Sequence, residues 1–366
     1  MNSIKMQKSI ENPMIIVYNK TFIQILDGEK MPKFYKCDGY KDCLDIRTTD
    51  KAIKYVKDNF ENIFARRLGL ERITAPLFVT SQSGLNDNLN GTERPVSFDI
   101  PDAKEDTVQI VHSLAKWKRL ALRRYGYGVG EGIYTDMNAV RRDEELDNLH
   151  SIYVDQWDWE KIIAKEDRNL DFLYNIADEI FASICETQDK LCDKFTSLRP
   201  MIKRRLEMIS SNDLLKKYPD LSPKEREDAI AKECGSVLIT QIGGILSNGE
   251  RHDGRAPDYD DWNLNGDLLV WYEPLKRAIE LSSMGIRVDP ESMARQLALA
   301  GCDDRRELPF HKELLSGNLP QTVGGGIGQS RLCLIMLNKI HIGQVQASVW
   351  GEETLTECEK NGIMLL

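Results

Sequence analysis

The sequence predicts an α+β fold built on a mostly antiparallel sheet that is flanked by helices. Three observations support this class: a helical period over residues 51–66, two consecutive strand-like runs, and short strands alternating with turns in the last third. Strands with polar residues on one face, mixed with helices, are typical of such a domain. We expect residues 1–45 to form an N-terminal extension and residues 46–366 to form a single domain.

Hydrophobic spacing predicts the elements of the first half. Apolar residues recur at helical spacing from about residue 49, and Leu68-Gly69 ends this helix. The apolar positions are Ile53, Val56, Phe60, Ile63 and Phe64. A strand-like piece over 77–79 and a second helix over 112–125 follow. Two longer strands, 133–140 and 151–160, would form a hairpin with a charged loop over 141–148.

The second half is predicted to be helical first and mixed afterwards. Residues 160–235 have a helical pattern that is interrupted near Arg199-Pro200 and Tyr218-Pro219. The elements expected beyond them are strands over 236–244, 266–271 and 278–288, a helix over 290–300, a glycine turn, a helix over 331–338 and a final strand over 344–350.

Composition narrows the class of protein. The chain has 49 basic and 58 acidic residues and a formal charge of −9, which argues against a nucleic-acid partner. The longest apolar run, Leu332–Leu337, is too short to cross a membrane. Without a signal-peptide pattern, a cytoplasmic enzyme or binding protein is expected. The eight cysteines include no Cys-x-x-Cys pair, so we expect free thiols.

A glycine-rich segment carries the strongest local signal. Gly324 to Gly328 holds four glycines in five positions, and Arg331 follows in the first turn of the expected helix. Gly326 and Gly328 would let the backbone approach a ligand closely, and a helix N-terminus suits anions. We interpret this segment as a phosphate-handling turn. The alternative is a glycine-rich surface turn that carries an exposed arginine.

Alternation along the second hairpin strand points to a polar site. In an extended strand Gln156 and Asp158 share one face, while Trp157 and Trp159 share the other. Two tryptophans would hold their face in the core and leave the polar face to line a site. The alternative is a face in contact with solvent.

Charged residues in the last third suggest further ligands. Three carboxylates, including Asp260, follow Arg255 around a proline turn. Asp267 begins one predicted strand, and Glu280 lies on another with Ser282 on the same face. If Asp267 and Glu280 converge they would suit Mg²⁺ shared with phosphates; otherwise they are separate surface acids.

Two cations on different elements could hold one carboxylate. Lys118 lies on the predicted helix 112–125, and Arg287 ends the predicted strand 278–288. The alternative for Lys118 is an ordinary solvated position on a basic helix. We interpret the five histidines, His112 before Ser113 among them, as local hydrogen-bonding residues rather than ligands.

Together these segments resemble the aspartate–ammonia ligase family from about residue 50 to the C-terminus. The matching blocks are 82–91 in part, 112–119, 154–159, 255–262, 265–267, 280–289, 321–331 and 341–347. That family is similar in fold to the class II aminoacyl-tRNA synthetases. Residues 51–76 look like the first class II motif, the hairpin with Arg141 like the second, and 326–331 like the third. The resemblance implies a homodimer.

The resemblance also implies a reaction. L-Aspartate would be activated by ATP as a β-aspartyl-adenylate, and ammonia would convert it to L-asparagine with release of AMP and pyrophosphate. Free ammonia is expected because no amidotransferase domain precedes the core. A tRNA synthetase would need an anticodon-binding domain, for which no stretch remains. The other alternative, an inactive amino-acid-sensing paralogue, predicts loss of the ATP-handling residues, which are present.

Residue roles follow from the resemblance and from charge. Arg141 would neutralise the α-phosphate of ATP and Arg331 the γ-phosphate, because the arginine fork suits phosphate oxygens. Asp87 would accept the proton of ammonium. Mg²⁺ would be held by Asp267 and Glu280. Gln156 is expected to be catalytic with Asp87 and Arg141, and Glu280 to bind ATP as well as the metal ion. The expected aspartate-binding set comprises Lys118 and Arg287 at the α-carboxylate, Asp158 or Asp260 at the α-ammonium, with Gln156 and Ser282 as hydrogen-bonding partners and Ser113 and Arg255 around them.

Overall fold

The structure is a computed structural model that describes residues 34–35, 37, 39–89, 93–102 and 107–366. Most of the expected extension, residues 1–33, lies outside this part of the chain. All the described residues belong to one compact unit. Asp42 lies just before the first helix, and its carboxylate binds the ammonium group of the buried Lys339 at 2.6 Å. This ion pair anchors the start of the described chain to the C-terminal region.

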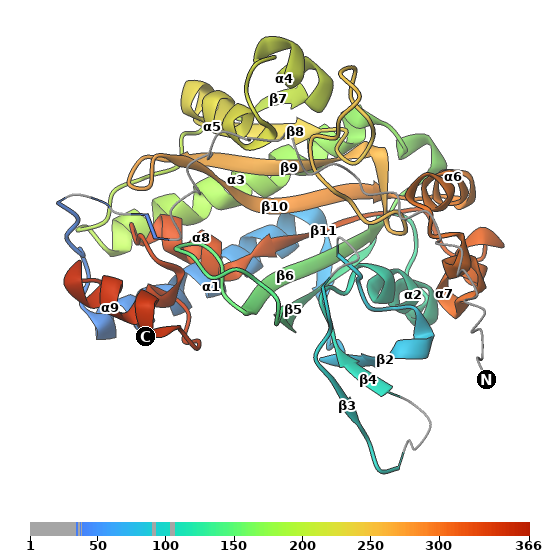
Figure 1. Cartoon of the computed structure of the whole chain (residues 1–366), viewed down its shortest axis with the longest axis horizontal. Coiled ribbons are helices and arrows are strands. Elements are labelled where there is room, and N and C mark those ends of the chain that lie inside the picture. Colours follow the sequence, from blue (N-terminus) through green and yellow to red (C-terminus); the bar gives the residue numbers. More distant parts are fainter. Residues whose placement is uncertain (1–33, 36, 38, 90–92, 103–106) are drawn as a thin grey trace, which may run out of the picture. The chain divides into compact units, whose positions relative to one another are not determined.

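The main sheet has eight strands in the order β1-β5-β6-β11-β10-β9-β8-β7 (Figure 1). Their bounds are β1 Leu70–Arg72, β5 Gly132–Val140, β6 Tyr153–Ile162, β7 Glu207–Ser210, β8 Ser236–Thr240, β9 Asp260–Tyr272, β10 Arg277–Arg287 and β11 Thr322–Gly328. The central pairings are antiparallel, as predicted, but the two outermost, β1 with β5 and β7 with β8, are parallel. The sheet is therefore mixed.

A smaller antiparallel sheet of three strands, in the order β2-β4-β3, precedes the second helix. Its strands are β2 Phe78–Thr80, β3 Ser97–Asp99 and β4 Thr107–Ile110. Only β2 corresponds to a predicted strand. The other two are three and four residues long, too short for an alternating pattern to be distinctive.

The helices lie mostly where hydrophobic spacing placed them. They are α1 Ile46–Leu68, α2 Ala115–Tyr125, α3 Leu170–Lys194, α4 Ser211–Lys217, α5 Pro223–Cys234, α6 Pro290–Ala300, α7 Pro309–Leu315, α8 Gln329–Met336 and α9 Glu352–Lys360. The Asp45 side chain caps α1 by accepting from two backbone amides, and Gly69 ends it in the left-handed region at φ 66°. The predicted end at Leu68-Gly69 is confirmed.

The core lies between the sheet and the pair α1 and α3, which cover one face of it (Figure 1). Phe60 of α1 contacts Trp157 at a ring-centroid distance of 4.6 Å, and Phe64 contacts Trp159 at 6.1 Å. Both tryptophans are fully buried. The predicted alternation of β6 is confirmed, and its polar residues occupy the opposite face of the sheet.

Three predicted elements are wrong. The glycine segment is not a turn: residues 322–328 form strand β11, which pairs with β6 on one side and β10 on the other. Residues 207–210, predicted as helix, form the edge strand β7. Residues 344–350, predicted as a strand, form part of the short 3₁₀ helix Ile342–Gln344 followed by irregular chain.

The cysteines and the apolar content of the helices bear on the predictions made from composition. All eight cysteines are free thiols, as predicted. Within the part of the chain that the structure describes, no helix has the length and apolar character needed to cross a bilayer.

Candidate active site

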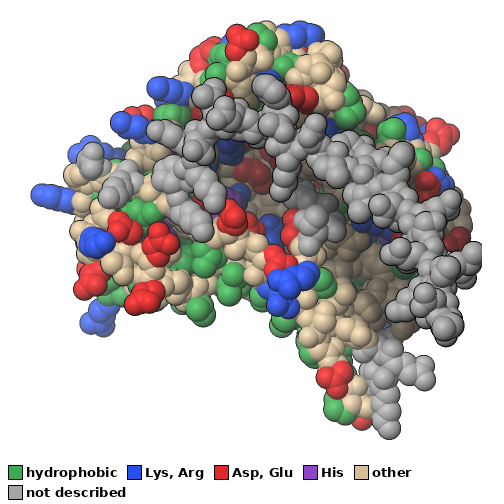
Figure 2. All heavy atoms as spheres, viewed as in Figure 1, with side chains coloured by type: hydrophobic (Ala, Val, Ile, Leu, Met, Phe, Trp, Pro, Cys, Tyr) green, Lys and Arg blue, Asp and Glu red, His purple; other side chains and the backbone are tan. Residues whose placement is uncertain are grey.

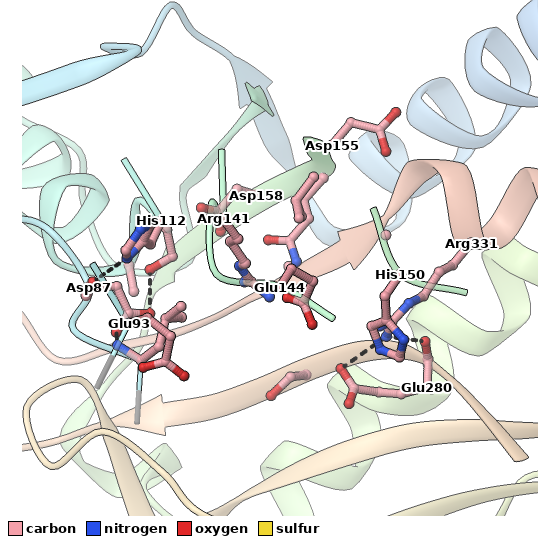
Figure 3. A pocket seen from close by; sticks show the side chains of 18 of the residues that line it. Asp87, Glu93, His112, Arg141, Glu144, His150, Asp155, Asp158, Glu280 and Arg331 are labelled. Atoms are coloured by element: carbon pink, nitrogen blue, oxygen red, sulfur yellow. Dashed lines mark hydrogen bonds and ion pairs between the residues drawn. The ribbon is translucent and has the colours of Figure 1, made fainter. Parts of the chain in front are cut away.

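A cavity of about 480 Å³ lies on the polar face of the main sheet, and Figure 3 shows side chains that line it. Acidic and basic side chains lie close together over this face of the molecule (Figure 2). The predicted site residues that line the cavity are Asp87, Ser113, Arg141, Gln156, Asp158, Arg255, Asp260, Glu280, Arg287, Gly326, Gly328 and Arg331. Three others, Lys118, Asp267 and Ser282, are not on its wall.

The glycines of β11 form the floor of this cavity. A Cβ at position 324 would overlap with Glu160 Oε2 and lie 2.5 Å from Arg287 Nη2. A Cβ at position 326 would lie 2.5 Å from Gln156 Oε1. Heavy atoms cannot approach so closely, so side chains from β6 and β10 occupy the space that the glycines leave open. The glycine run makes room for these side chains and does not form a phosphate turn.

Arg287 is the centre of a buried charge network. Its Nε donates to both oxygens of Glu160 at 3.1 and 3.0 Å, and its Nη2 donates to Glu160 Oε2 at 2.8 Å. Its Nη1 donates to Asp260. The Thr322 hydroxyl donates to Glu160 Oε1 at 2.7 Å, so the Glu160 carboxylate is held from two strands.

The two acids of this network differ in pKa direction. Burial alone raises the pKa of Glu160, but the charges of Arg287 and Lys118 outweigh it and hold that pKa below its usual range. For Asp260 burial dominates over Arg287 and raises the pKa. Glu160 is therefore the firmly ionised partner of Arg287, and Asp260 is the acid whose charge responds more readily to a ligand.

Lys118 is buried and does not line the cavity. Its ammonium group binds the Asp158 carboxylate and donates to the carbonyls of Trp159 at 2.8 Å and Gly325 at 3.3 Å. Burial lowers the pKa of Lys118, against the opposing effect of Asp158. The structure therefore brings Lys118 together with Asp158 and places only Arg287 of the two expected cations on the cavity wall.

Asp87 lies at one end of the cavity (Figure 3), where it forms a second polar group with Ser113. Ser113 Oγ donates to Asp87 Oδ2 at 2.9 Å, and the Leu89 amide donates to Asp87 Oδ1 at 2.9 Å. Asn86 Oδ1 accepts from the amides of Asp87 and His112 at 2.9 and 2.8 Å. These bonds join the loop before β3 to the start of α2 and fix the buried Asp87 carboxylate.

Two arginines enter the cavity from different elements. Arg141 stands where β5 ends, and its buried Nε has no partner among the described residues. Arg331, in the first turn of α8, donates from Nη1 to the Glu280 carbonyl at 3.2 Å and lies 4.0 Å from the Glu280 carboxylate. Arg141 is thus available to an anion, and Arg331 is held only loosely.

Glu280 is close enough to Asp267 for its charge to affect that carboxyl group. Burial raises the pKa of Asp267 to about 7, and Glu280 adds to this effect although Arg255 opposes it. Asp267 Oδ2 accepts from Arg255, while its buried Oδ1 has no partner among the described residues. No cluster of three or more metal-ligating side chains occurs in the described ranges.

The prediction that Ser282 shares a face with Glu280 is wrong. A register shift between Glu280 and Ser282 in the pairing of β10 with β9 breaks the simple alternation. Ser283 instead stands opposite Asp267 and lines the cavity. Ser282 pairs with Leu268 and is absent from the cavity wall. A bulge of this kind has no signature in a single sequence.

Sequence reasoning also missed two other site residues. Glu160 lies two residues beyond Asp158, so extending the strand alternation by one step would have placed it on the polar face. His112 was interpreted as a local hydrogen-bonding residue, yet it lines the cavity with one ring nitrogen unpaired among the described residues.

The fold of the described residues is shared with proteins of known structure. The structure is similar to asparaginyl-tRNA synthetase from Pyrococcus horikoshii complexed with asparaginyl-adenylate, with a TM-score of 0.61 and 14% sequence identity. The match covers 84% of this chain and 71% of that one. At this identity the likeness shows the fold alone, which is that of class II aminoacyl-tRNA synthetases.

The sequence comparisons then define the family within that class. The family model described as aspartate-ammonia ligase matches residues 47–362, so the chain belongs to that family. An aspartate–ammonia ligase of Clostridium perfringens (strain 13 / Type A) is 57% identical over 336 residues, 92% of this chain and 100% of that protein. One from Lactobacillus johnsonii is 56% identical over 328 residues, 89% and 98% of the two chains.

Proposed function

We propose that this chain catalyses the ATP-dependent amidation of L-aspartate by ammonia, giving L-asparagine, AMP and pyrophosphate through a β-aspartyl-adenylate. The observation that carries the proposal is one cavity whose wall holds Arg141, with an Nε that has no partner among the described residues, a loosely held Arg331, and Arg287 bound to two acids. Arg141 and Arg331 suit phosphate groups, because their guanidinium groups are open to an anion. Arg287 with its neighbouring acids suits an amino acid that carries both a carboxylate and an ammonium group.

The activation step follows from the charges around the phosphates. A carboxylate is a poor electrophile, and its attack on the α-phosphorus places more negative charge on the phosphate oxygens. Arg141 would bind the α-phosphate and Arg331 the γ-phosphate, which stabilises that charge in the transition state. Gly326 leaves room for Gln156 beside the bound ATP, and Gly328, whose Cβ position has no neighbour closer than 3.4 Å, would let ATP approach β11.

Aspartate would lie over the network of Arg287. Its α-carboxylate would bind Arg287, with the buried Lys118 adding positive charge nearby, and its ammonium group would bind Asp158 or Asp260. Gln156, which crosses Gly326, and Ser283, which replaces the predicted Ser282, would donate and accept hydrogen bonds. Arg255, which also lines the cavity, would add positive charge near the bound aspartate. This arrangement leaves the β-carboxylate free to face ATP.

Ammonia would enter beside Asp87. At neutral pH it arrives mostly as ammonium, which a buried carboxylate attracts and from which it can accept a proton. Ser113 and the Leu89 amide hold the two Asp87 oxygens, so the carboxylate keeps one orientation.

Mg²⁺ would be held by Asp267 and Glu280. The test of fit is the buried Asp267 Oδ1, an oxygen without a partner among the described residues, adjacent to a second carboxylate. Mg²⁺ prefers oxygen ligands and usually completes its shell with water and substrate phosphates, so two carboxylates suffice. When bound, the ion would neutralise charge on the departing pyrophosphate. Removal of divalent cations by EDTA should abolish turnover, and added Mg²⁺ should restore it.

We also propose that the enzyme is a homodimer and that residues 46–366 form its catalytic domain, with 1–45 as an extension. The segment after α1 and β1 exposes Leu77 and Phe78 by 48% and 43%, an apolar surface of the kind that a second copy would cover. Sedimentation of the full chain should give the mass of two copies. A monomeric mass at catalytic concentrations would exclude this assembly.

Product analysis tests the reaction directly. The enzyme is incubated with ATP, Mg²⁺ and L-aspartate, with and without ammonium. We expect asparagine, AMP and pyrophosphate in equal amounts, and none of them in quantity without ammonium. ADP and phosphate would instead indicate an acyl phosphate. Binding of ATP and aspartate without any asparagine would favour the amino-acid-sensing paralogue.

A further inference from the structure

His112 lies at the junction of the two loops that shape one end of the cavity. It precedes α2 by three residues, and its side chain contacts the segment that carries Asp87 (Figure 3). The distance from His112 Nδ1 to the Asp87 carbonyl oxygen is 3.0 Å. A carbonyl oxygen can only accept a hydrogen bond, so Nδ1 must carry the proton. In the neutral ring, Nε2 then holds the lone pair.

That lone pair has no partner among the described residues. His112 is only 1% exposed, yet it lines the cavity, and its Nε2 is buried without a hydrogen bond. An unsatisfied buried acceptor costs about 1–3 kcal/mol, and one that lies on the wall of a cavity can recover this cost when a ligand donates to it. The neighbouring Asp87 oxygens already accept from Ser113 and Leu89.

We propose that His112 is a catalytic residue of the amidation step, accepting a proton at Nε2 from the attacking nitrogen. This inference rests on the proposed function and deepens it. Asp87 supplies the negative charge that attracts ammonium, and His112 supplies the neutral base beside it. The two act as a pair because the bond from Nδ1 to the Asp87 carbonyl fixes their relative positions.

Ammonium first loses one proton to the Asp87 carboxylate and becomes ammonia. The nitrogen lone pair then forms the C–N bond at the β-carbonyl carbon of the adenylate. The bond from that carbon to the phosphate oxygen breaks, and its electron pair leaves with AMP. The nitrogen, now carrying a surplus proton, transfers it to His112 Nε2, and the product is the neutral amide of asparagine.

Two variants separate the functions of the ring. His112→Asn keeps a side-chain N–H for the Asp87 carbonyl but has no group at the position of Nε2. His112→Gln reaches the position of Nε2 with an amide oxygen, which accepts a hydrogen bond but does not take up a proton at neutral pH. If His112 only supports the loop, each of the two substitutions should change the activities in all assays to the same extent.

Three assays are run on each full-length variant: aspartate-dependent exchange of pyrophosphate into ATP, asparagine formation with ammonium, and hydroxamate formation with hydroxylamine. Exchange reports adenylate formation alone. Hydroxylamine is largely unprotonated at neutral pH and is a strong nucleophile, so it depends little on a base.

The expected result is exchange and hydroxamate formation within about twofold of wild type, with asparagine formation lowered about 10²-fold or more in both variants. His112→Gln should keep a KM for ammonium closer to wild type than His112→Asn. Full asparagine formation in His112→Asn would overturn the inference and leave the proposed function standing. Equal loss in all three assays would assign His112 a structural role only. If the wild type itself showed no exchange of pyrophosphate into ATP, both the proposed adenylate intermediate and the inference about His112 would be wrong.

Discussion

Arg287 Nη2 and Glu160 Oε2 are 2.8 Å apart in the interior of the sheet, and Glu160 is fully buried. A second contact through Nε makes the pairing a fork, which fixes the plane of the guanidinium. The remaining Nη1 is bound to Asp260, so the whole guanidinium is oriented before any substrate arrives. Such preorganisation lowers the cost of binding a carboxylate.

Replacing Glu160 should therefore weaken aspartate binding through Arg287. In Glu160→Gln the charge that balances Arg287 is lost, but one hydrogen bond can remain. We expect KM for aspartate to rise about 10- to 100-fold, because hydrogen bonds between charged groups contribute about 1.5–3 kcal/mol. KM for ATP should change little, since Arg141 and Arg331 lie elsewhere in the cavity. Steady-state kinetics with each substrate varied in turn measures the difference, and an equal rise for both substrates would contradict this assignment.

Gly324 is required for the same pair. In Gly324→Ala the new Cβ overlaps Glu160 Oε2, so one of the two side chains must move. We expect a loss of aspartate-dependent exchange together with about 1–3 kcal/mol of stability, the usual cost of overpacking. Gly351→Ala is the matched control because nothing lies within 4 Å of its Cβ position. Urea unfolding and exchange assays on both variants test this, and a fully active Gly324→Ala protein would refute it.

Arg141 should matter for adenylate formation more than for aspartate binding. Its Nε is unpaired among the described residues, so its hydrogen-bonding capacity is open to phosphate. Arg141→Gln should lower the pyrophosphate exchange rate about 10²- to 10³-fold, the scale expected for losing one transition-state donor. Arg141→Lys should restore only part of the rate, because lysine lacks the planar fork. Arg124→Gln, on the exposed side of α2, is the control and should exchange at the wild-type rate.

His341 should make the stability of the fold depend on pH. Burial lowers the pKa of this histidine to about 4, so it stays neutral in the folded state while the unfolded chain binds a proton below about pH 6.5. Stability is then lost as pH falls from 6.5 towards 4. Its contribution between pH 7 and pH 5 should be about 2 kcal/mol.

The variant His341→Asn isolates this effect. His341 Nδ1 accepts from the Gly343 amide at 3.1 Å, and the asparagine oxygen can accept the same bond. The free energy of unfolding in urea is measured at pH 7 and pH 5 for both proteins. We expect the decrease between the two pH values to be smaller in the variant by about the amount assigned to His341. Identical decreases would show that His341 titrates normally in the folded protein.

The sequence by itself determined the features that depend on local spacing. The period of α1, its end at Gly69 and the alternation of β6 are all set by neighbouring residues, and the structure confirms them. Twelve of the fifteen expected site residues line the cavity. They were found because sequence blocks that match the family contain them, and no knowledge of their positions in space was needed.

Only the tertiary structure decided how distant strands meet. Gly324 was interpreted as part of a turn because local sequence cannot show that β6 and β10 would flank it and fill its empty side with Glu160 and Arg287. The choice of Ser283 over Ser282 depended on a register shift, which exists only in the pairing of two strands. The unpaired Nε2 of His112 likewise emerged only when the loop of Asp87 folded against α2. Spacing along the chain defines faces, whereas contacts between elements define which side chain is satisfied and which remains available to a substrate.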